Sequence, residues 1–335
     1  MCLYPKLIKN RKYIPNKKNK GIIPKMTDER VKYVPIGCGK CMECKKQKSN
    51  SWRTRLMEEI RENKEATFVT FTFSKESYTK LYFGTKETDS YEKDNEIATK
   101  ATRLFLELWR KKTKKSIKHW LITELGQNET EALHIHGIIW SPDTELIKNT
   151  WKHGITWCGT WVNEQTINYI VKYVFKTDTK HKEYNPKILC SKGIGNNYTK
   201  RTDCKQNQYK GKETNESYRL RNGNKTSLPI YYRNKIYSEE QREILWLNKL
   251  DKNERWILGQ KIDISDNYDL YNNILKTAQE KNIRLKYGDG TKNWNSEQYE
   301  RERRRLKQEE KIYKANKVEA SESPRRRGSN QKGLD

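Results

Sequence analysis

The sequence is poor in apolar residues and contains no long apolar run. Only 33% of its 335 residues are hydrophobic, whereas 34% are charged. No stretch of about 18 apolar residues is present, so we expect no membrane-spanning helix. The opening residues MCLYPKLIKNRKYIP hold no hydrophobic signal core and are not expected to act as a secretory leader. A hydrophobic core can therefore occupy only part of the chain, with long solvated segments beside it.

Cysteine is scarce and unevenly placed. The chain has seven cysteines, an odd number, and three of them fall within residues 38–44. A disulfide framework normally uses an even set of spaced cysteines, so this distribution favours a reducing compartment. The Gly-x-x-x-x-Gly-Lys-Ser/Thr motif of P-loop NTPases is also missing, which excludes a fused P-loop helicase.

Acidic residues are too few to balance the basic ones. Lys and Arg number 70 against 43 Asp and Glu, which gives a formal net charge of +27. A surplus of this size costs self-repulsion in the folded state and usually serves an anionic partner. The positive charge is interleaved with 20 Tyr and 10 Trp, which can stack on bases while Lys and Arg contact phosphates. The composition therefore favours single-stranded nucleic acid over a membrane surface.

The periodicity of apolar residues predicts an α+β fold with a charged tail. We expect irregular structure in 1–50, an extended segment at 228–236, a capping box at Ser238 and Gln241, and disorder in 321–335. Helices are predicted at 46–63, 96–112 and 164–177, and strands at 68–73, 118–125 and 132–140. The expected parts are a Cys-rich segment with a helix (1–65), a core (66–180), an accessory region (181–275) and a basic, partly disordered tail (276–335).

The two predicted strands at 118–125 and 132–140 would form a hairpin able to hold a metal. Side chains at i and i+2 of a strand share one face, so His134 and His136 point the same way. A turn centred near residue 129 places Glu124 directly opposite His134, with Cβ atoms about 4.5–5.5 Å apart. Two imidazoles and a carboxylate with open positions suit Mg²⁺ or Mn²⁺ bound together with a phosphate oxygen. The alternative is a pair of surface histidines on a half-exposed strand.

The predicted helix at 164–177 presents two phenols and two ammonium groups together. Tyr169, Lys172, Tyr173 and Lys176 fall at i, i+3, i+4 and i+7, on one stripe of the helix. The opposite side is apolar and is expected to pack on the sheet. A metal-bound phosphate and a nearby Lys would favour the phenolate that a tyrosine nucleophile needs. The alternative is an amphipathic helix with a solvated Tyr/Lys face.

The cysteine cluster is a candidate metal site. Cys38, Cys41 and Cys44 form a C-x₂-C-x₂-C run, which supplies three of the four thiolates that a structural zinc ion requires. Cys2 is the fourth candidate, since its coordination would fix the N-terminal segment. An iron–sulfur cluster can use similar spacing, and free thiols in a loop are the remaining alternative.

Together these motifs resemble those of the HUH endonucleases, the replication initiators and relaxases that cut single-stranded DNA. More narrowly, the chain resembles the replication initiators of gokushovirus-type microviruses. The likeness covers about residues 1–260. It depends on the His-apolar-His strand, the Tyr-x-x-Lys helix and the segments 1–5, 38–44, 191–195 and 228–237. One departure is that the family often has Gly-Glu-Tyr-Gly, where this chain has Thr123-Glu-Leu-Gly126.

This resemblance implies a ferredoxin-like antiparallel sheet with flanking helices and the Glu–His–His metal site on its open face. It implies that Tyr173 attacks a phosphate at the origin and becomes joined to the 5′ phosphate, which frees a 3′ hydroxyl as a primer. Tyr169 would make the second cut that closes the circle. Lys172 and Lys176 would stabilise the phosphate charge.

The implied partners are single-stranded circular DNA, the origin of its replicative form, and a host helicase and DNA polymerase, in the cytoplasm of a bacterial host. Two other readings remain open at this point. One is a relaxase or plasmid-type initiator with the same chemistry. The other is a non-catalytic, zinc-stabilised single-strand-binding protein, which has no use for the Glu–His–His group or the two tyrosines.

Overall fold

The computed structural model of the chain describes residues 2–26, 28, 31–126, 132–159, 161–176, 181, 184–265 and 268–288. The end predicted to be disordered, 321–335, lies outside these residues, as does most of the loop between the two hairpin strands. Within the described parts, no helix combines the length and apolarity needed to cross a membrane.

The centre of the fold is a five-stranded antiparallel sheet in the order β6-β3-β5-β4-β7. Two helices connect β3 to β4, and one connects β5 to β6, so the chain follows the β-α-β-β-α-β order of a ferredoxin-like fold with β7 added at one edge. The fold is therefore α+β, as predicted. Its elements are β3 (Thr67–Phe71), α2 (Lys75–Phe83), α3 (Ser90–Thr113), β4 (His119–Leu125), β5 (Leu133–Ile139), α4 (Thr144–Thr150), β6 (Thr156–Gly159) and β7 (Ile188–Cys190).

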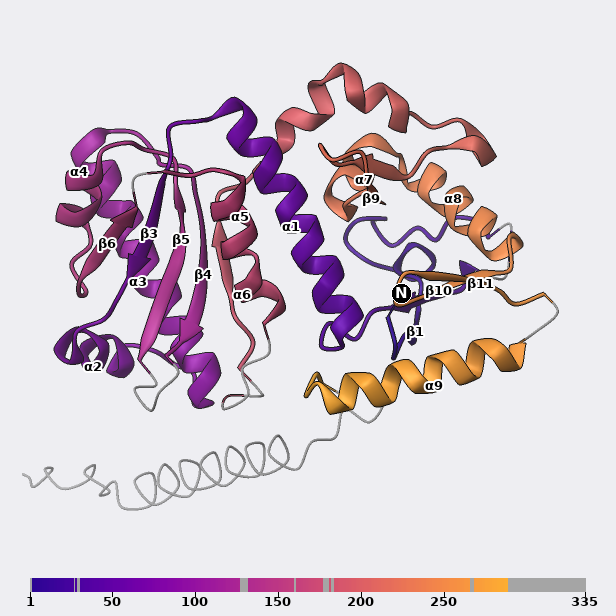
Figure 1. The fold of residues 1–335 in the computed structure, drawn as a ribbon, viewed down its shortest axis with the longest axis horizontal. Coiled ribbons are helices and arrows are strands. Elements are labelled where there is room, and N and C mark those ends of the chain that lie inside the picture. The colour runs from indigo at the N-terminus through magenta and orange to yellow at the C-terminus, as the bar shows by residue number, and fades with distance from the viewer. Residues whose placement is uncertain are drawn as a thin grey trace, which may run out of the picture.

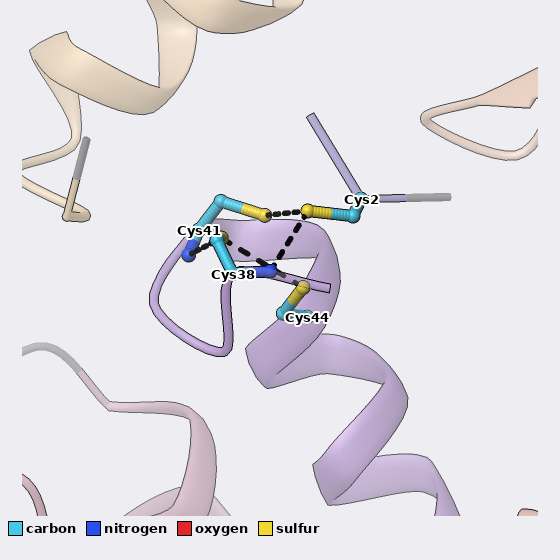
Figure 2. A group of neighbouring side chains, drawn as sticks. All are labelled: Cys2, Cys38, Cys41 and Cys44. Atoms are coloured by element: carbon cyan, nitrogen blue, oxygen red, sulfur yellow. Dashed lines mark hydrogen bonds between the residues drawn. The ribbon is translucent and has the colours of Figure 1, made fainter. Parts of the chain in front are cut away.

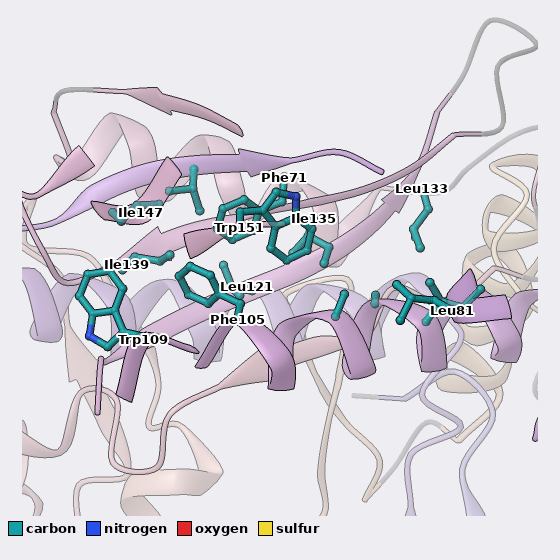
Figure 3. Close-up of a cluster of buried hydrophobic side chains, with 14 of the residues drawn as sticks. Phe71, Leu81, Phe105, Trp109, Leu121, Leu133, Ile135, Ile139, Ile147 and Trp151 are labelled. Carbon is teal, nitrogen blue, oxygen red and sulfur yellow. The ribbon is translucent and has the colours of Figure 1, made fainter. Parts of the chain in front are cut away.

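Helices cover both faces of this sheet. On one face α2, α3 and α4 bury a core in which Phe71 stacks on Trp151 at 4.3 Å between ring centroids (Figure 3). On the other face α1 (Met42–Glu62), α5 (Glu164–Ile170) and α6 (Lys172–Phe175) pack on Trp120, Ile122 and Ile138. Alternate residues of β4 and β5 serve the two faces, as the period of a strand requires. The side chains of β4 and β5 that lie beyond this second core are thus free to form a site.

Helix α1 lies between the sheet and the C-terminal elements (Figure 1). It carries a carboxylate, Glu58, whose side chain has no exposed surface. Arg61 and Arg201 contact its two oxygens at 3.1 and 2.7 Å, and the hydroxyl of Tyr218 donates to it. A buried charge is tolerated only when it is paired and hydrogen-bonded, and here its partners come from distant parts of the chain.

The adjacent carboxylate, Glu59, is also buried and joins the same elements. Its Oε1 contacts Lys118 at 2.6 Å, and its Oε2 accepts a hydrogen bond from the backbone of Gly195 at 2.7 Å. Two neighbouring carboxylates of α1 therefore attach the sheet on one side and residues 194–218 on the other.

The remaining elements form two smaller clusters. The first packs the N-terminus against β10, β11 and α9 around Leu3, Tyr4 and Tyr271. The second is rich in tyrosine and joins the 3₁₀ segments to α7 and α8. The elements are β1 (Lys6–Lys9), η1 (Arg11–Tyr13), β2 (Tyr33–Ile36), η3 (Asn196–Lys200), η4 (Thr202–Asn207), η5 (Gly211–Glu213), β8 (Ser217–Arg219), β9 (Lys225–Ser227), α7 (Ile230–Ile236), α8 (Glu239–Asp251), β10 (Glu254–Ile257), β11 (Gln260–Asp263) and α9 (Tyr268–Arg284).

Several local predictions are corrected by the structure. The segment predicted to be extended at 228–236 is mostly helix α7, which begins after Pro229 and is followed by the predicted capping box of α8, where Ser238 and Gln241 cap each other. The segment 1–50 is not wholly irregular, because β1 and β2 pair with each other. The helix predicted at 164–177 breaks at Val171 into α5 and α6. Helix α2 was not predicted, and α9 runs across the boundary placed at 275.

The buried position of Glu58 leads to a test of stability. We expect Glu58→Ala to lower the free energy of unfolding by about 3–5 kcal/mol, because Arg61, Arg201 and Tyr218 would be left unpaired. Denaturant unfolding followed by circular dichroism measures this. Glu145→Ala removes an exposed ion pair with Lys148 and is the matched control, with little effect expected. Equal midpoints for the two variants would contradict the structural role of Glu58.

Candidate functional site

The register of the hairpin places the predicted side chains as expected. Glu124 of β4 is paired with His134 of β5, and His136 is paired with Ile122 on one side and Thr70 of β3 on the other. All four polar side chains lie on the sheet face that α5 and α6 cover further along. Thr70 was not predicted as part of the site, although its alternation with Phe71 in the strand indicates its face.

His136 is held in a fixed orientation. The hydroxyl of Thr70 is 3.0 Å from its Nδ1, and its Nε2 lies 2.8 Å from Oε2 of Glu124. Nε2 is buried and has no well-aligned hydrogen bond among the described residues, so its lone pair is directed at the carboxylate without a firm partner. A neighbour that fixes one ring nitrogen and aims the other is typical of histidines that bind metals.

His134 lies beside this pair but faces another way. Its ring is 6.1 Å from the ring of His136 and interacts with the backbone of Ala132. Burial and the neighbouring His136 lower the pKa of His134, which favours the neutral ring that a metal needs. His134, His136 and Glu124 do not all bring a ligand atom within 4.8 Å of one another; among the described residues only the cysteine cluster does so.

Both tyrosines of the predicted stripe reach the same place. The ring of Tyr173 stacks on His136 with 4.7 Å between centroids and 3° between planes. The hydroxyls of Tyr169 and Tyr173 are 2.8 Å apart. Beneath them, the apolar side of α5 and α6 is buried on the sheet, as predicted. The tyrosine pair is therefore fixed above the histidine rather than solvated on an open helix face.

The two lysines of the stripe have different neighbours. Lys176 forms an ion pair with Oε1 of Glu124 at 3.3 Å. Lys172 places its ammonium 5.6 Å from the ring centroid of Tyr169. Both side chains are exposed, so their charge is available to a bound anion.

The electrostatics of the site set Glu124 and Tyr173 apart. Burial alone raises the pKa of Glu124, but His136 and Lys176 outweigh it, and the net effect lowers that pKa below its usual value. Burial, the hydrogen bond to Tyr169 and the negative charge of Glu124 raise the pKa of Tyr173. Without an added cation the site therefore holds an ionised carboxylate and a neutral phenol.

This donor set fits a hard divalent cation in part. Glu124 and His136 offer a carboxylate oxygen and an aimed imidazole nitrogen, which are ligand types that Mn²⁺ and Mg²⁺ sites accept. His134 completes the set only if its ring turns away from Ala132.

The four cysteines named from the sequence form the second candidate site (Figure 2). Their sulfur atoms all lie within 4.8 Å of one another. Cys2 is 3.9 Å from Cys41, and Cys38 is 3.9 Å from Cys44, sulfur to sulfur. A tetrahedral ion with bonds of about 2.3 Å requires about 3.8 Å between sulfurs. The cluster could therefore hold a metal ion.

The surroundings of the cluster favour thiolates. Three of its members lie at the start of α1, where the helix dipole stabilises negative charge. Backbone N–H groups of Tyr4 and Cys38 donate to the sulfur of Cys2 at 3.3 and 3.2 Å. Hydrogen bonds from Cys2, Cys41 and Cys44 lower the pKa of the Cys38 thiol, while the same bonding raises the pKa of Cys44. A metal cation would relieve this competition by accepting all four sulfurs.

Comparison with known proteins agrees with the core of this site. The model of the replication-associated protein ORF2 family matches residues 66–178, which include β3 to β6 and both tyrosines. No curated protein and no solved structure matches the chain significantly. The family match supports a role in replication initiation for this part of the chain.

The sulfur geometry predicts that the purified protein carries about one metal ion per chain in a closed four-ligand site. Cys44→Ser should reduce the bound metal and lower the melting temperature, because α1 would lose its attachment to the N-terminus. Elemental analysis and thermal unfolding measure the two effects. Cys158→Ser, outside the cluster, is the control and should keep the metal. Metal-free native protein with four reactive thiols in the cluster would refute the site.

Proposed function

We propose that residues 66–178 nick single-stranded DNA at an origin and initiate rolling-circle replication. The observation that carries this proposal is the position of Tyr173, whose ring lies on His136 while its hydroxyl meets that of Tyr169. A phenol beside a carboxylate–imidazole pair and exposed lysines has the parts needed for attack on a phosphodiester. The match to a replication-associated family supports the same conclusion.

In the proposed reaction, the hydroxyl oxygen of Tyr173 attacks the scissile phosphorus. The new P–O bond joins Tyr173 to the 5′ phosphate as the bond to the 3′ oxygen breaks, and that oxygen takes up a proton and becomes the primer end. The phenolic proton passes along the 2.8 Å contact to Tyr169, whose half-exposed side chain can return it to solvent. The phosphodiester energy is kept in the tyrosine link, so rejoining remains available.

Glu124, His134 and His136 would hold Mg²⁺ or Mn²⁺, which would polarise the scissile phosphate. The residues explain why such a cation matters for Tyr173. Its pKa is raised partly by the negative charge of Glu124, and neutralising that charge removes one cause of the increase. Lys176, already paired with Glu124, would turn to the phosphate once the carboxylate has another partner.

The second tyrosine suits the closing step. Tyr169 lies one helical turn before Tyr173 and shares its hydrogen bond, so both hydroxyls can reach one scissile position in turn. We propose that Tyr169 cuts the regenerated origin and that the new 3′ hydroxyl displaces Tyr173 from the first link. Lys172, near the ring of Tyr169, would serve the phosphate in this step.

We further propose that the ion in the cysteine cluster is zinc with a structural role. Four thiolates with no open position are the usual ligands of structural zinc. The partners we propose are single-stranded circular DNA, the origin of its replicative form, and a host helicase and DNA polymerase, in a bacterial cytoplasm.

The nucleophile can be assigned with labelled origin single strands and Mn²⁺. Tyr173→Phe should abolish the covalent protein–DNA adduct, whereas Tyr169→Phe should still form it and lose circle closure. Gel separation of the labelled adduct and of closed circles measures both. Tyr82→Phe, an exposed tyrosine on α2, is the matched control. An adduct formed by Tyr173→Phe would show that another residue attacks.

The alternative of a non-catalytic binding protein is tested at the histidines. His134→Ala/His136→Ala should slow nicking by about two orders of magnitude or more, because charge stabilisation at the phosphate is lost, while single-strand affinity stays near wild type. His153→Ala is the control, since this histidine bonds to Ser77 outside the site. Wild-type protein that binds single strands but never nicks them would favour the alternative.

A further inference from the structure

The edge strand β6 exposes tryptophan beside the candidate site. Trp157 is 57% exposed and Trp161 is 81% exposed, although tryptophan is highly buried on average. Neither position is loosely held. Trp157 lies within the paired strand, and the backbone carbonyl of Trp161 accepts a hydrogen bond from Thr166 of α5 at 3.2 Å.

Trp157 shares its face and its cross-strand row with the site. Thr70 is paired with Trp157 on one side and with His136 on the other, so the three side chains lie in one row across the sheet. Neighbouring strands are about 4.8 Å apart, which puts the backbones of Trp157 and His136 about 10 Å from each other. The indole and the site therefore open to the same solvent.

Aromatic contacts connect the two places without a gap. Trp157 meets Phe68 edge-on at 5.7 Å between centroids, and Phe68 meets Tyr169 at 6.1 Å. Tyr169 in turn meets Tyr173 at 5.6 Å. Gly159 makes room for this arrangement, because a Cβ there would lie 2.9 Å from the indole of Trp157. The exposed ring is thus held over the edge of the sheet rather than left to rotate.

Cations border this surface at both ends. Lys172 and Lys176 lie at the tyrosine end, and Arg221 is paired with Glu164, three residues beyond Trp161. Exposed aromatic rings in line with positive charge are the arrangement that binds single strands, since bases stack on rings while phosphates meet cations.

We propose that Trp157 and Trp161 form a stacking platform for bases of the single strand next to the scissile phosphate. The platform rests on the proposed nicking function for its purpose. Its occupant is single-stranded DNA, because the surface is continuous with the tyrosine pair and is bordered by cations. The platform fixes where the strand crosses the sheet and so delivers one phosphate to Tyr173.

Equilibrium binding of fluorescent oligonucleotides to the full chain, without added divalent cation, tests the platform separately from cleavage. Trp157→Ala and Trp161→Ala should each weaken binding by roughly 5- to 150-fold, the usual effect of losing one stacked base. Trp157→Phe should restore most of the affinity. Trp256→Ala, a 49% exposed tryptophan on β10, is the matched control and should bind as wild type.

Oligonucleotides with abasic sites separate stacking from structural damage. The loss in Trp157→Ala should shrink on abasic DNA, and the salt dependence of its binding should keep the wild-type slope, whereas Lys172→Ala should flatten that slope. A tryptophan variant that binds normal DNA as wild type does, or that loses equally on abasic DNA, overturns the platform. Nicking by wild-type protein with unaffected variants would refute the platform alone. Weakened variant binding in a protein that never nicks would refute only the nicking function.

Discussion

Glu124 faces His134 across two antiparallel strands, and the rest of the site depends on that register. Because side chains alternate along a strand, a slip of one residue would move Glu124 to the face that packs on α3. The register is secured by apolar residues on both faces, with Ile135 buried on one side and Ile138 on the other. The stability of two cores thus maintains the position of one carboxylate.

Helix α1 extends this constraint beyond the sheet. Its first turn carries cysteines of the cluster, and its last turns carry the two buried carboxylates Glu58 and Glu59. Between them, Leu56 packs in the same core as the helices that carry the tyrosines. The N-terminal segment, the sheet and the C-terminal elements therefore share one helix, which explains why a chain with so few hydrophobic residues can hold them together.

Much of the candidate site could be predicted from the sequence because it follows from short periods. The i, i+2 spacing of His134 and His136, the turn position that opposes Glu124, and the four-residue spacing of the tyrosines are all local. The contact of Cys2 with the other cysteines was also anticipated. Whether these residues nick DNA stays a prediction, supported by the match over residues 66–178.

Features that depend on distant contacts could not be predicted. Glu58 reads as a surface charge in its helix, and only Arg201 and Tyr218 explain its burial. The break at Val171 has no glycine or proline to announce it. There, the hydroxyl of Ser49 on α1 donates to the carbonyl of Val171 at 3.2 Å. This bond braces the tyrosine helices from behind, so the ordering entropy of both nucleophile side chains is met during folding, and incoming DNA encounters a site that is already preorganised.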